Sequence, residues 1–334
     1  MKVFLEDDIA KALTPQVAID ALRQALNEQA AGLVQMPPRQ TTDAGNDPAG
    51  LDKQHGANWL RISTAFLNGQ GVMGFKAMNR AAGLGMRYLI GLYDIASGEL
   101  LSMMDANEVT TSRTAATSAL GTHLLAEPAS RTVGILGTGV QARALLRCYA
   151  MLRDLDDVVV YSPTPASRDA FVRYAEADLG LTARAARTAE EVTSASTVLL
   201  AVRATREPVF FAEWLRPGMH VTGLSSVRYD AREVDDDTWS RADVVVVDDR
   251  VNVSHSGDAM SIASSGRFDI DHAAELYELH AGRVHRSGAE QITLFKSSGN
   301  AMQDVALAAA VYRELHDVGI GHDLDAFPAV KPYA

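Results

Sequence analysis

The sequence of 334 residues is poor in cysteine, in basic side chains and in long apolar runs. Its single cysteine, Cys148, excludes an intrachain disulfide and reads as a small core residue, which fits a reducing, cytoplasmic compartment. Lys and Arg number 31 against 42 Asp and Glu, and the net charge of −11 argues against nucleic acid or an anionic membrane as a partner. No run approaches the roughly 18 apolar residues of a membrane span, and the first residues do not resemble a signal peptide.

The nine histidines show none of the spacings that are typical of a zinc site, so no bound metal is expected. His55 lies in a polar, glycine-rich stretch. We interpret it as a solvated loop histidine, with a substrate contact as the alternative.

Two patterns divide the chain. Residues 57–105 contain short apolar runs separated by turn signals such as "DIASGE", which predicts antiparallel strands. From residue 132 onward, valine-rich runs alternate with helical stretches, which predicts a parallel sheet that is covered on both faces. Further helices are predicted over residues 14–32, with Thr14 as N-cap; 107–126, with Asn107 as a possible cap; and 300–317. The last helix is expected to pack on the first domain, so the parallel domain is inserted.

The stretch "TVGILGTGVQARALL" reads as a strand, a glycine turn and a helix. Gly137 permits a tight turn, Gly139 lets a pyrophosphate approach the backbone, and Ala142 allows the helix to pack closely on the strand. The N-terminus of the helix then offers free N–H groups to the phosphates. This context predicts a dinucleotide site.

The second strand of that domain bears on the choice between NAD and NADP. An NAD site usually has a carboxylate at the end of this strand, but Asp156 and Asp157 stand at its start. Hydroxyl groups and Arg168 follow its end and suit a 2′-phosphate, so we expect NADP, with NAD as the alternative. The residues expected to contact the cofactor are Thr114, Gly137, Thr138, Gly139, Val140, Gln141, Ala142, Ser162, Thr164, Arg168, Val202 and Ser225.

Three cations stand in unusual surroundings. Arg39 follows two prolines in "QMPPR", Lys76 lies in the apolar strand "MGFKAM", and Arg113 lies among small residues on a predicted helix. Each alone is compatible with a salt-bridged surface residue. Together they predict an anion clamp, because arginine binds carboxylates through two parallel hydrogen bonds.

A fourth cation, Arg87, precedes Tyr88 on a predicted strand. Successive side chains on a strand point to opposite faces, so at most one of the two faces the site. Arg87 either binds a second substrate carboxylate or faces the solvent.

The chain resembles the ornithine cyclodeaminase/mu-crystallin family through "MPPR", "GFK", "SGELLSMMDANEVTTSRTAATSALGTHLLA", "GILGTGVQAR" and "FKSSGNAMQDVALA". These motifs follow the family's order and span nearly the whole chain. The resemblance implies an α/β subunit in which a Rossmann dinucleotide-binding domain, residues 119–298, is inserted into an α+β substrate-binding and dimerisation domain, residues 1–118 and 299–334. It also implies a homodimer, with Arg39 and Arg113 holding the substrate carboxylate and Lys76 beside the reacting carbon.

One departure bears on the reaction. Val227 stands where true ornithine cyclodeaminases are expected to have an aspartate that deprotonates the substrate amine. Ketimine reductases have an Arg-Pro-Asp element there, which Arg228 and Asp230 partly resemble.

The resemblance therefore implies NAD(P)H-dependent reduction of a 2-imino acid to an amino acid, or the reverse dehydrogenation, with Lys76 donating or relaying the proton. The alternatives are an ornithine or lysine cyclodeaminase that uses NAD catalytically, and an NADP-dependent protein that binds a small ligand without turnover.

Overall fold

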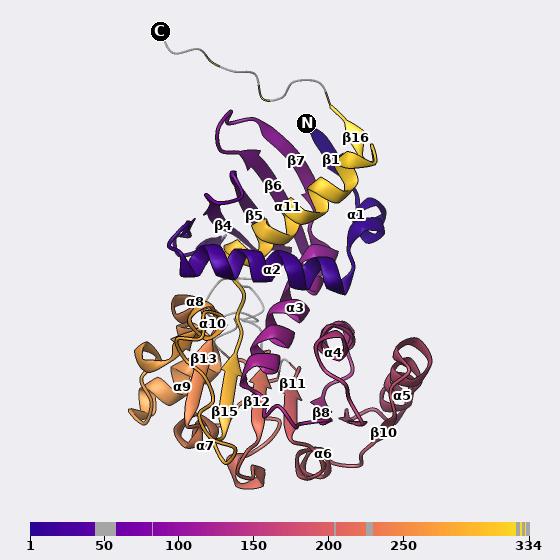
Figure 1. The fold of residues 1–334 in the computed structure, drawn as a ribbon, viewed down its shortest axis with the longest axis vertical. Coiled ribbons are helices and arrows are strands. Elements are labelled where there is room, and N and C mark those ends of the chain that lie inside the picture. Colours follow the sequence, from indigo (N-terminus) through magenta and orange to yellow (C-terminus); the bar gives the residue numbers. More distant parts are fainter. Residues whose placement is uncertain are drawn as a thin grey trace. The chain divides into compact units, whose positions relative to one another are not determined.

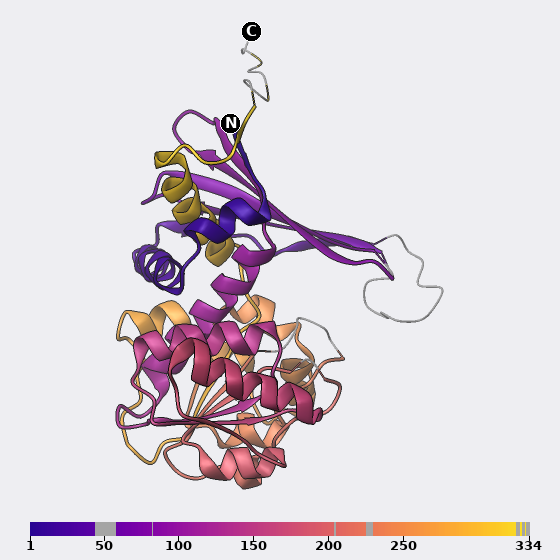
Figure 2. The same cartoon turned by 90° about the vertical axis from the view of Figure 1, so that its right-hand side faces the viewer.

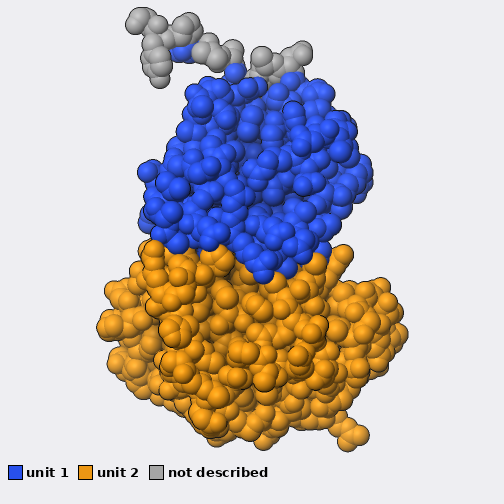
Figure 3. Space-filling view, in the orientation of Figure 1, with its two compact units in different colours: residues 1–113, 300–334 blue, residues 114–299 orange. Residues whose placement is uncertain are grey.

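The computed structural model describes residues 1–43, 58–81, 83–203, 205–224, 230–324, 328 and 331. The chain forms two compact units, which Figure 3 colours separately. Unit 1 consists of Met1–Arg113 and Asn300–Ala334, and unit 2 consists of Thr114–Gly299. A continuous helix, α3 (Asn107–Leu125), runs through the first boundary. Among the described residues, no helix is long and apolar enough to cross a membrane.

The sheet of unit 1 is mainly antiparallel, as the turn signals predicted. Its strand order is β16-β1-β7-β6-β5-β4-β2, with β3 also paired to β4, and β1 runs parallel to β7. Gly98 has φ +69° in the turn between β6 and β7, a conformation that favours glycine. The strands are β1 (Lys2–Phe4), β2 (Val34–Gln35), β3 (Gln40–Asp43), β4 (Trp59–Leu67), β5 (Val72–Ala81), β6 (Gly85–Asp94), β7 (Leu100–Asp105) and β16 (His322–Asp323).

Helices α2 (Pro15–Ala30) and α11 (Ala301–Asp317) lie on one face of this sheet, with α1 (Glu6–Ala12) beside them (Figure 1). Both long helices begin as predicted: the side chain of Thr14 accepts a hydrogen bond from Val17 N, and that of Asn300 accepts one from Gln303 N. The apolar stripes of the two helices are buried against each other, and α11 also packs on β4 and β5. The last helix therefore returns to the first unit, as the sequence predicted.

Helix α3 begins differently from the expectation. Asn107 is its first helical residue, not its cap, and the side chain of Asp105 accepts a hydrogen bond from Asn107 N. The amide of Asn107 instead donates to Glu6 Oε1 at 3.0 Å. The acidic side chain just ahead of the helix thus performs the capping that was expected of Asn107.

Strand β4 buries an arginine and exposes several of its apolar side chains. Arg61, Ala65 and Leu67 are buried, whereas Leu60 is 46% exposed and Ile62 is 40% exposed. Alternation along a strand places the two sets on opposite faces. The face with the buried set is covered by α11, and the other face presents apolar side chains.

The sheet of unit 2 is parallel throughout, in the order β10-β9-β8-β11-β12-β15-β13-β14. Helices cover both of its faces, as Figure 2 shows, and its central strands are buried along their whole length, which explains their valine-rich runs. The strands are β8 (Thr132–Leu136), β9 (Asp157–Tyr161), β10 (Ala183–Ala185), β11 (Val198–Ala201), β12 (His220–Gly223), β13 (Val244–Val247), β14 (Ala274–Glu275) and β15 (Thr293–Lys296).

Helices in unit 2 follow most of these strands. Cys148 is buried on α4, and burial raises the pKa of its thiol to about 12, which agrees with the prediction of a core residue. The helices are α4 (Val140–Leu152), α5 (Pro165–Leu179), α6 (Ala189–Ala195), α7 (Asp236–Arg241), α8 (Arg250–Ser254), α9 (Gly257–Ser265) and α10 (Leu276–His280), with 3-10 turns at Ala212–Trp214 and Ile270–His272.

Candidate active site

The glycine turn of unit 2 joins β8 to α4. Gly137 has φ +123°, and a Cβ there would lie 2.5 Å from the carbonyl oxygen of Val202, so only glycine fits. Gly139 is the N-cap of α4 and gives it no side-chain cap, and a Cβ on Gly139 would meet nothing within 4 Å. Ala142 is buried where α4 packs on the sheet.

This turn fits the pyrophosphate of a dinucleotide. The first N–H groups of α4 are not capped by a side chain, and the space over Gly139 is open, so an anion can reach the backbone. Val140 and Gln141 begin α4, and Thr138 lies between the two glycines. The residues predicted to hold the pyrophosphate therefore share one turn.

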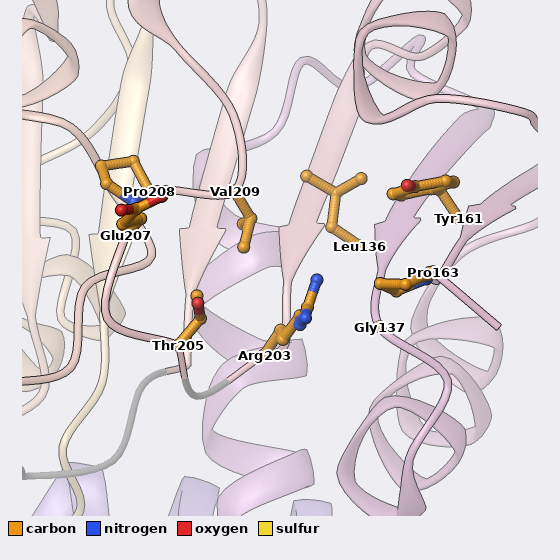
Figure 4. Close-up of a pocket in the computed structure, with 9 residues that line it drawn as sticks. All are labelled: Leu136, Gly137, Tyr161, Pro163, Arg203, Thr205, Glu207, Pro208 and Val209. Atoms are coloured by element: carbon orange, nitrogen blue, oxygen red, sulfur yellow. The ribbon is translucent and has the colours of Figure 1, made fainter.

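A cavity of about 300 Å³ opens beside this turn (Figure 4). It lies at the carboxyl ends of β8 and β9, next to the loop that follows β11, the usual place for a ligand in an open parallel sheet. Arg203 and Glu207 belong to its wall and were not predicted. The lining residues are Leu136, Gly137, Tyr161, Pro163, Arg203, Thr205, Glu207, Pro208 and Val209.

The residues that the sequence indicated for a 2′-phosphate lie at the end of β9. The guanidinium of Arg168 lies 5.6 Å from the centre of the Tyr161 ring, and its Nη1 donates to Ala186 O at 3.2 Å. Ser162 and Thr164 lie between them in the chain. Asp157 begins β9 and pairs with Arg184 at 3.2 Å, at the opposite end of the strand from the cavity. Hydroxyls and a cation, not a carboxylate, therefore follow this strand.

The structure describes only some of the other residues that were predicted for unit 2. Thr114 lies on α3, and Val202 follows β11, where its N–H donates to Leu136 O at 2.9 Å. Asp230 lies 3.4 Å from Arg206. The predictions for His55, Ser225, Val227 and Arg228 concern residues outside the described ones.

In unit 1 the strand register brings two of the three predicted cations together. Lys76 on β5 is paired with Ser63 on β4, and Gln40 on β3 is paired with Ile62. Arg39 directly precedes Gln40, so continuing the register places it beside Ser63, on the same face as Lys76. The charge of Arg39 acts on Lys76 and lowers its pKa, which agrees with this placement.

Asp304 on α11 joins Lys76 to the third cation. Its Oδ1 atom lies 3.0 Å from Lys76 Nζ and 2.9 Å from Arg113 Nε. Arg113 also donates from Nη1 to Gln303 Oε1 at 3.0 Å. The side chains of Lys76, Arg113, Gln303 and Asp304 are all buried. Arg39, Lys76 and Arg113 with Asp304 are called the unit 1 cluster below.

Burial, together with the charges of Arg113 and Arg39, lowers the pKa of Lys76 to about 8, although the charge and hydrogen bond of Asp304 act in the opposite direction. A lysine with this pKa is a competent proton donor near neutral pH, because a substantial part of it can lose its proton there. Geometry and acidity therefore both suit Lys76 for acid–base chemistry.

Tyr88, and not Arg87, faces this cluster. The Lys76 ammonium lies 5.1 Å from the centre of the Tyr88 ring, whereas Arg87 is exposed on the opposite face of β6. Burial raises the pKa of the Tyr88 hydroxyl. The expectation that at most one of the two faces the site is confirmed.

The sequence did not indicate Asp304 or Gln303. A signal was present, because "NAMQDVALAAA" places one acidic residue in an otherwise apolar helix, and a buried carboxylate needs a cation. What the sequence does not provide is the partner, which lies 228 positions earlier in the chain.

Unit 2 holds a second buried lysine that the sequence also did not indicate. Lys296 Nζ lies 3.3 Å from Glu233 Oε2 and forms a shorter ion pair with Asp258 Oδ2, and all three side chains are fully buried. Glu233 also accepts a hydrogen bond from Arg203 N in the loop beside the cavity. Lys296, Glu233 and Asp258 are called the unit 2 cluster below.

A Rossmann-type unit with a glycine turn and an anion-compatible helix N-terminus, in one chain with a buried acid–base cluster, defines an enzyme of the NAD(P)-dependent oxidoreductase class. The family model "Ornithine cyclodeaminase/mu-crystallin family" matches residues 2–319. The chain belongs to this family.

Several proteins are similar over most of the chain. "Ketimine reductase mu-crystallin" of Mus musculus is 33% identical over 222 residues, which are 66% of this chain and 67% of that protein. The structure of Thermococcus litoralis Δ(1)-pyrroline-2-carboxylate reductase in complex with NADH and L-proline has a TM-score of 0.88 at 28% identity, over 97% of this chain and 100% of that one. An archaeal alanine dehydrogenase dimer with bound NAD has a TM-score of 0.88 at 28% identity, over 98% of this chain and 99% of that one.

Proposed function

We propose that this protein reduces a 2-imino acid to an amino acid with NAD(P)H, and catalyses the reverse dehydrogenation. The observation that supports this most is the unit 1 cluster, in which Asp304 pairs with both Lys76 and Arg113 and the charge of Arg39 also acts on Lys76. The relatives named ketimine reductase, pyrroline-2-carboxylate reductase and alanine dehydrogenase support the same reaction.

In the proposed reaction Arg39 and Arg113 bind the substrate carboxylate, because a guanidinium can donate two hydrogen bonds to it. Fixing the carboxylate orients the neighbouring C=N group and lowers the entropic part of the barrier. Lys76 then donates a proton to the imine nitrogen. When bound, NAD(P)H would supply the hydride that the imine carbon gains, and with the proton on nitrogen this would convert C=N to CH–NH and leave NAD(P)+.

The cofactor would be held by the glycine turn and by the end of β9. The backbone from Gly137 to Ala142 would bind the pyrophosphate, and Ser162, Thr164 and Arg168 would bind a 2′-phosphate. We therefore propose NADP, with NAD as the second choice. Equilibrium binding of NADPH and NADH to wild type and Arg168→Ala tests this: Arg168→Ala should lose affinity for NADPH and keep its affinity for NADH.

The reaction is tested by absorbance at 340 nm with the purified protein. NADPH or NADH is mixed with piperideine-2-carboxylate, with pyrroline-2-carboxylate, or with pyruvate, glyoxylate or oxaloacetate in the presence of ammonia or methylamine. Cofactor oxidation that depends on both the protein and the imine is expected. If no imine is reduced, and L-ornithine with NAD yields proline and ammonia, the protein is a cyclodeaminase and the proposal is wrong.

A homodimer is proposed on the apolar face of the unit 1 sheet. Leu60, Ile62, Phe66 and Leu89 are each between 38% and 46% exposed, and three of them alternate along β4 with residues that face α11. Exposed apolar patches of this kind mark interaction surfaces, and one of the similar structures is a dimer. Light scattering should give twice the chain mass, and Leu60→Lys with Phe66→Lys should give the mass of one chain.

A further inference from the structure

Another cation, Arg61, which the sequence analysis did not indicate, lies on the sheet face of unit 1 that carries Lys76. Arg61 on β4 is paired with Met78 on β5, and Met78 is paired with Tyr88 on β6. Lys76 is two residues from Met78, so it points to the same face and is the diagonal neighbour of Arg61. Such neighbours are about 7–8 Å apart, within reach of long side chains.

Arg61 is held in a fixed direction inside the unit. Its side chain is 6% exposed, its Nε donates to Thr41 Oγ1 at 2.8 Å, and its guanidinium lies 5.1 Å from the centre of the Trp59 ring. Thr41 is also the strand neighbour of Arg61 on β3. A guanidinium that is stacked on an aromatic ring loses little further freedom when it binds a planar anion.

Two rows of side chains therefore cross this face of the sheet. One row contains Ser63 and Lys76, with Arg39 beside it, and the next contains Thr41, Arg61 and Tyr88. The rows are about 7 Å apart along the strands. A ligand whose first carboxylate is bound by Arg39 and Arg113 would meet the second row through a polar group at the other end of its carbon chain.

We propose that Arg61 determines substrate specificity by binding a second anionic group, so that the preferred substrate is a dicarboxylic 2-imino acid, or the corresponding dicarboxylic amino acid. This inference rests on the proposed function and deepens it by naming the substrate class. Arg61 binds the distal carboxylate, and the catalytic proton still comes from Lys76.

Arg87 was the residue that the sequence indicated for this task. It pairs with Asn79 and is exposed on the face of β6 away from Lys76, where it cannot contact the same ligand. The two arginines therefore form a matched pair for the test, one buried on the face of the cluster and one exposed on the other face.

The experiment compares kcat/KM for reductive amination of oxaloacetate and 2-oxoglutarate with that of pyruvate and 2-oxobutyrate, at saturating NADPH and a fixed ammonia concentration. Wild type should prefer a dicarboxylic substrate. Arg61→Met should lose on the order of 100-fold in kcat/KM for that substrate, mainly through KM, because a buried charged hydrogen bond is removed. Its activity with the monocarboxylic substrates should stay within a few-fold of wild type, and Arg87→Met should behave like wild type with all four.

The outcomes separate the two proposals. If none of the four substrates, nor a cyclic imine, is reduced, the proposed function is wrong. If imines are reduced but wild type prefers monocarboxylic substrates, or Arg61→Met lowers both classes equally, the role of Arg61 is wrong and the reaction stands. Arg61→Lys serves as a second variant. It keeps the charge and should retain part of the preference for the dicarboxylic substrate.

Discussion

The two units each bury a lysine with carboxylates, and the two clusters differ in the sign of their excess charge. In the unit 1 cluster one carboxylate, Asp304, pairs with both Lys76 and Arg113, and burial with the charges of Arg113 and Arg39 lowers the pKa of Lys76 to about 8. In the unit 2 cluster two carboxylates share Lys296, and burial together with the charge of Asp258 raises the pKa of Glu233 to about 8.

The charge of each cluster therefore depends on one proton. Loss of a proton from Lys76 reduces the positive charge of the unit 1 cluster, and a proton on Glu233 reduces the negative charge of the unit 2 cluster. The unit 1 cluster tends to lose a proton near neutral pH, and an anionic substrate would compensate its positive charge. The unit 2 cluster keeps a proton on Glu233 and is fully buried, so it is satisfied without a ligand. We therefore interpret the surplus of cations in the unit 1 cluster as the mark of the proposed binding site. The unit 2 cluster instead joins the end of β15 to α9 and to the segment that carries Glu233.

The largest effect on activity is expected for Lys76→Met, which tests the difference between the two clusters. Loss of the proton donor should lower kcat for imine reduction by about 10²–10⁴-fold. Since Asp304 keeps Arg113 as its partner, the free energy of unfolding should change by no more than about 1 kcal/mol. The rate is measured at 340 nm, and NADPH binding by fluorescence should match wild type. Retained turnover would exclude this role for Lys76.

For Lys296→Met we expect a loss of stability instead of a loss of activity. Two carboxylates would remain buried without their cation, which should cost about 3–5 kcal/mol of unfolding free energy. Denaturant unfolding followed by circular dichroism measures this. Lys11→Met is the matched control, because Lys11 lies in an exposed pair with Asp8 and should cost less than about 1 kcal/mol. Equal stability of Lys296→Met and Lys11→Met would contradict the structural role of the unit 2 cluster.

A smaller effect is expected for Asp304→Asn. Asp304 raises the pKa of Lys76 through its charge and its hydrogen bond, so its removal should lower that pKa below about 8. The decrease of kcat/KM with pH should then begin at lower pH than in wild type. Profiles that superimpose would show that Asp304 does not act on the proton donor.

The sequence alone predicted the parts of the site that depend on local pattern. The glycine turn, the strand–helix alternation and the three cations in unusual surroundings needed no knowledge of tertiary contacts. The roles of these residues and the domain boundaries at 118 and 299 stay predictions, as does the cytoplasmic location.

What the sequence could not provide depends on contacts between distant segments and on the choice of sheet face. Asp304 meets Lys76 only because α11 returns to the first unit. Arg61 reads as an ordinary polar residue between Leu60 and Ile62, and alternation would place those apolar neighbours inside. The structure buries Arg61 instead and exposes the apolar side chains, which agrees with the proposed binding site on one face and the proposed dimer interface on the other.

The central claim is that Lys76 is the proton donor, with a pKa set by the cluster around it. The most direct test is the pH dependence of kcat/KM for imine reduction by wild type, which reports the ionisation of the free enzyme. Protonated Lys76 is the active form, so kcat/KM should be constant below a pH of about 8 and fall about tenfold per pH unit above it. A profile that stays level well above that pH would contradict the account.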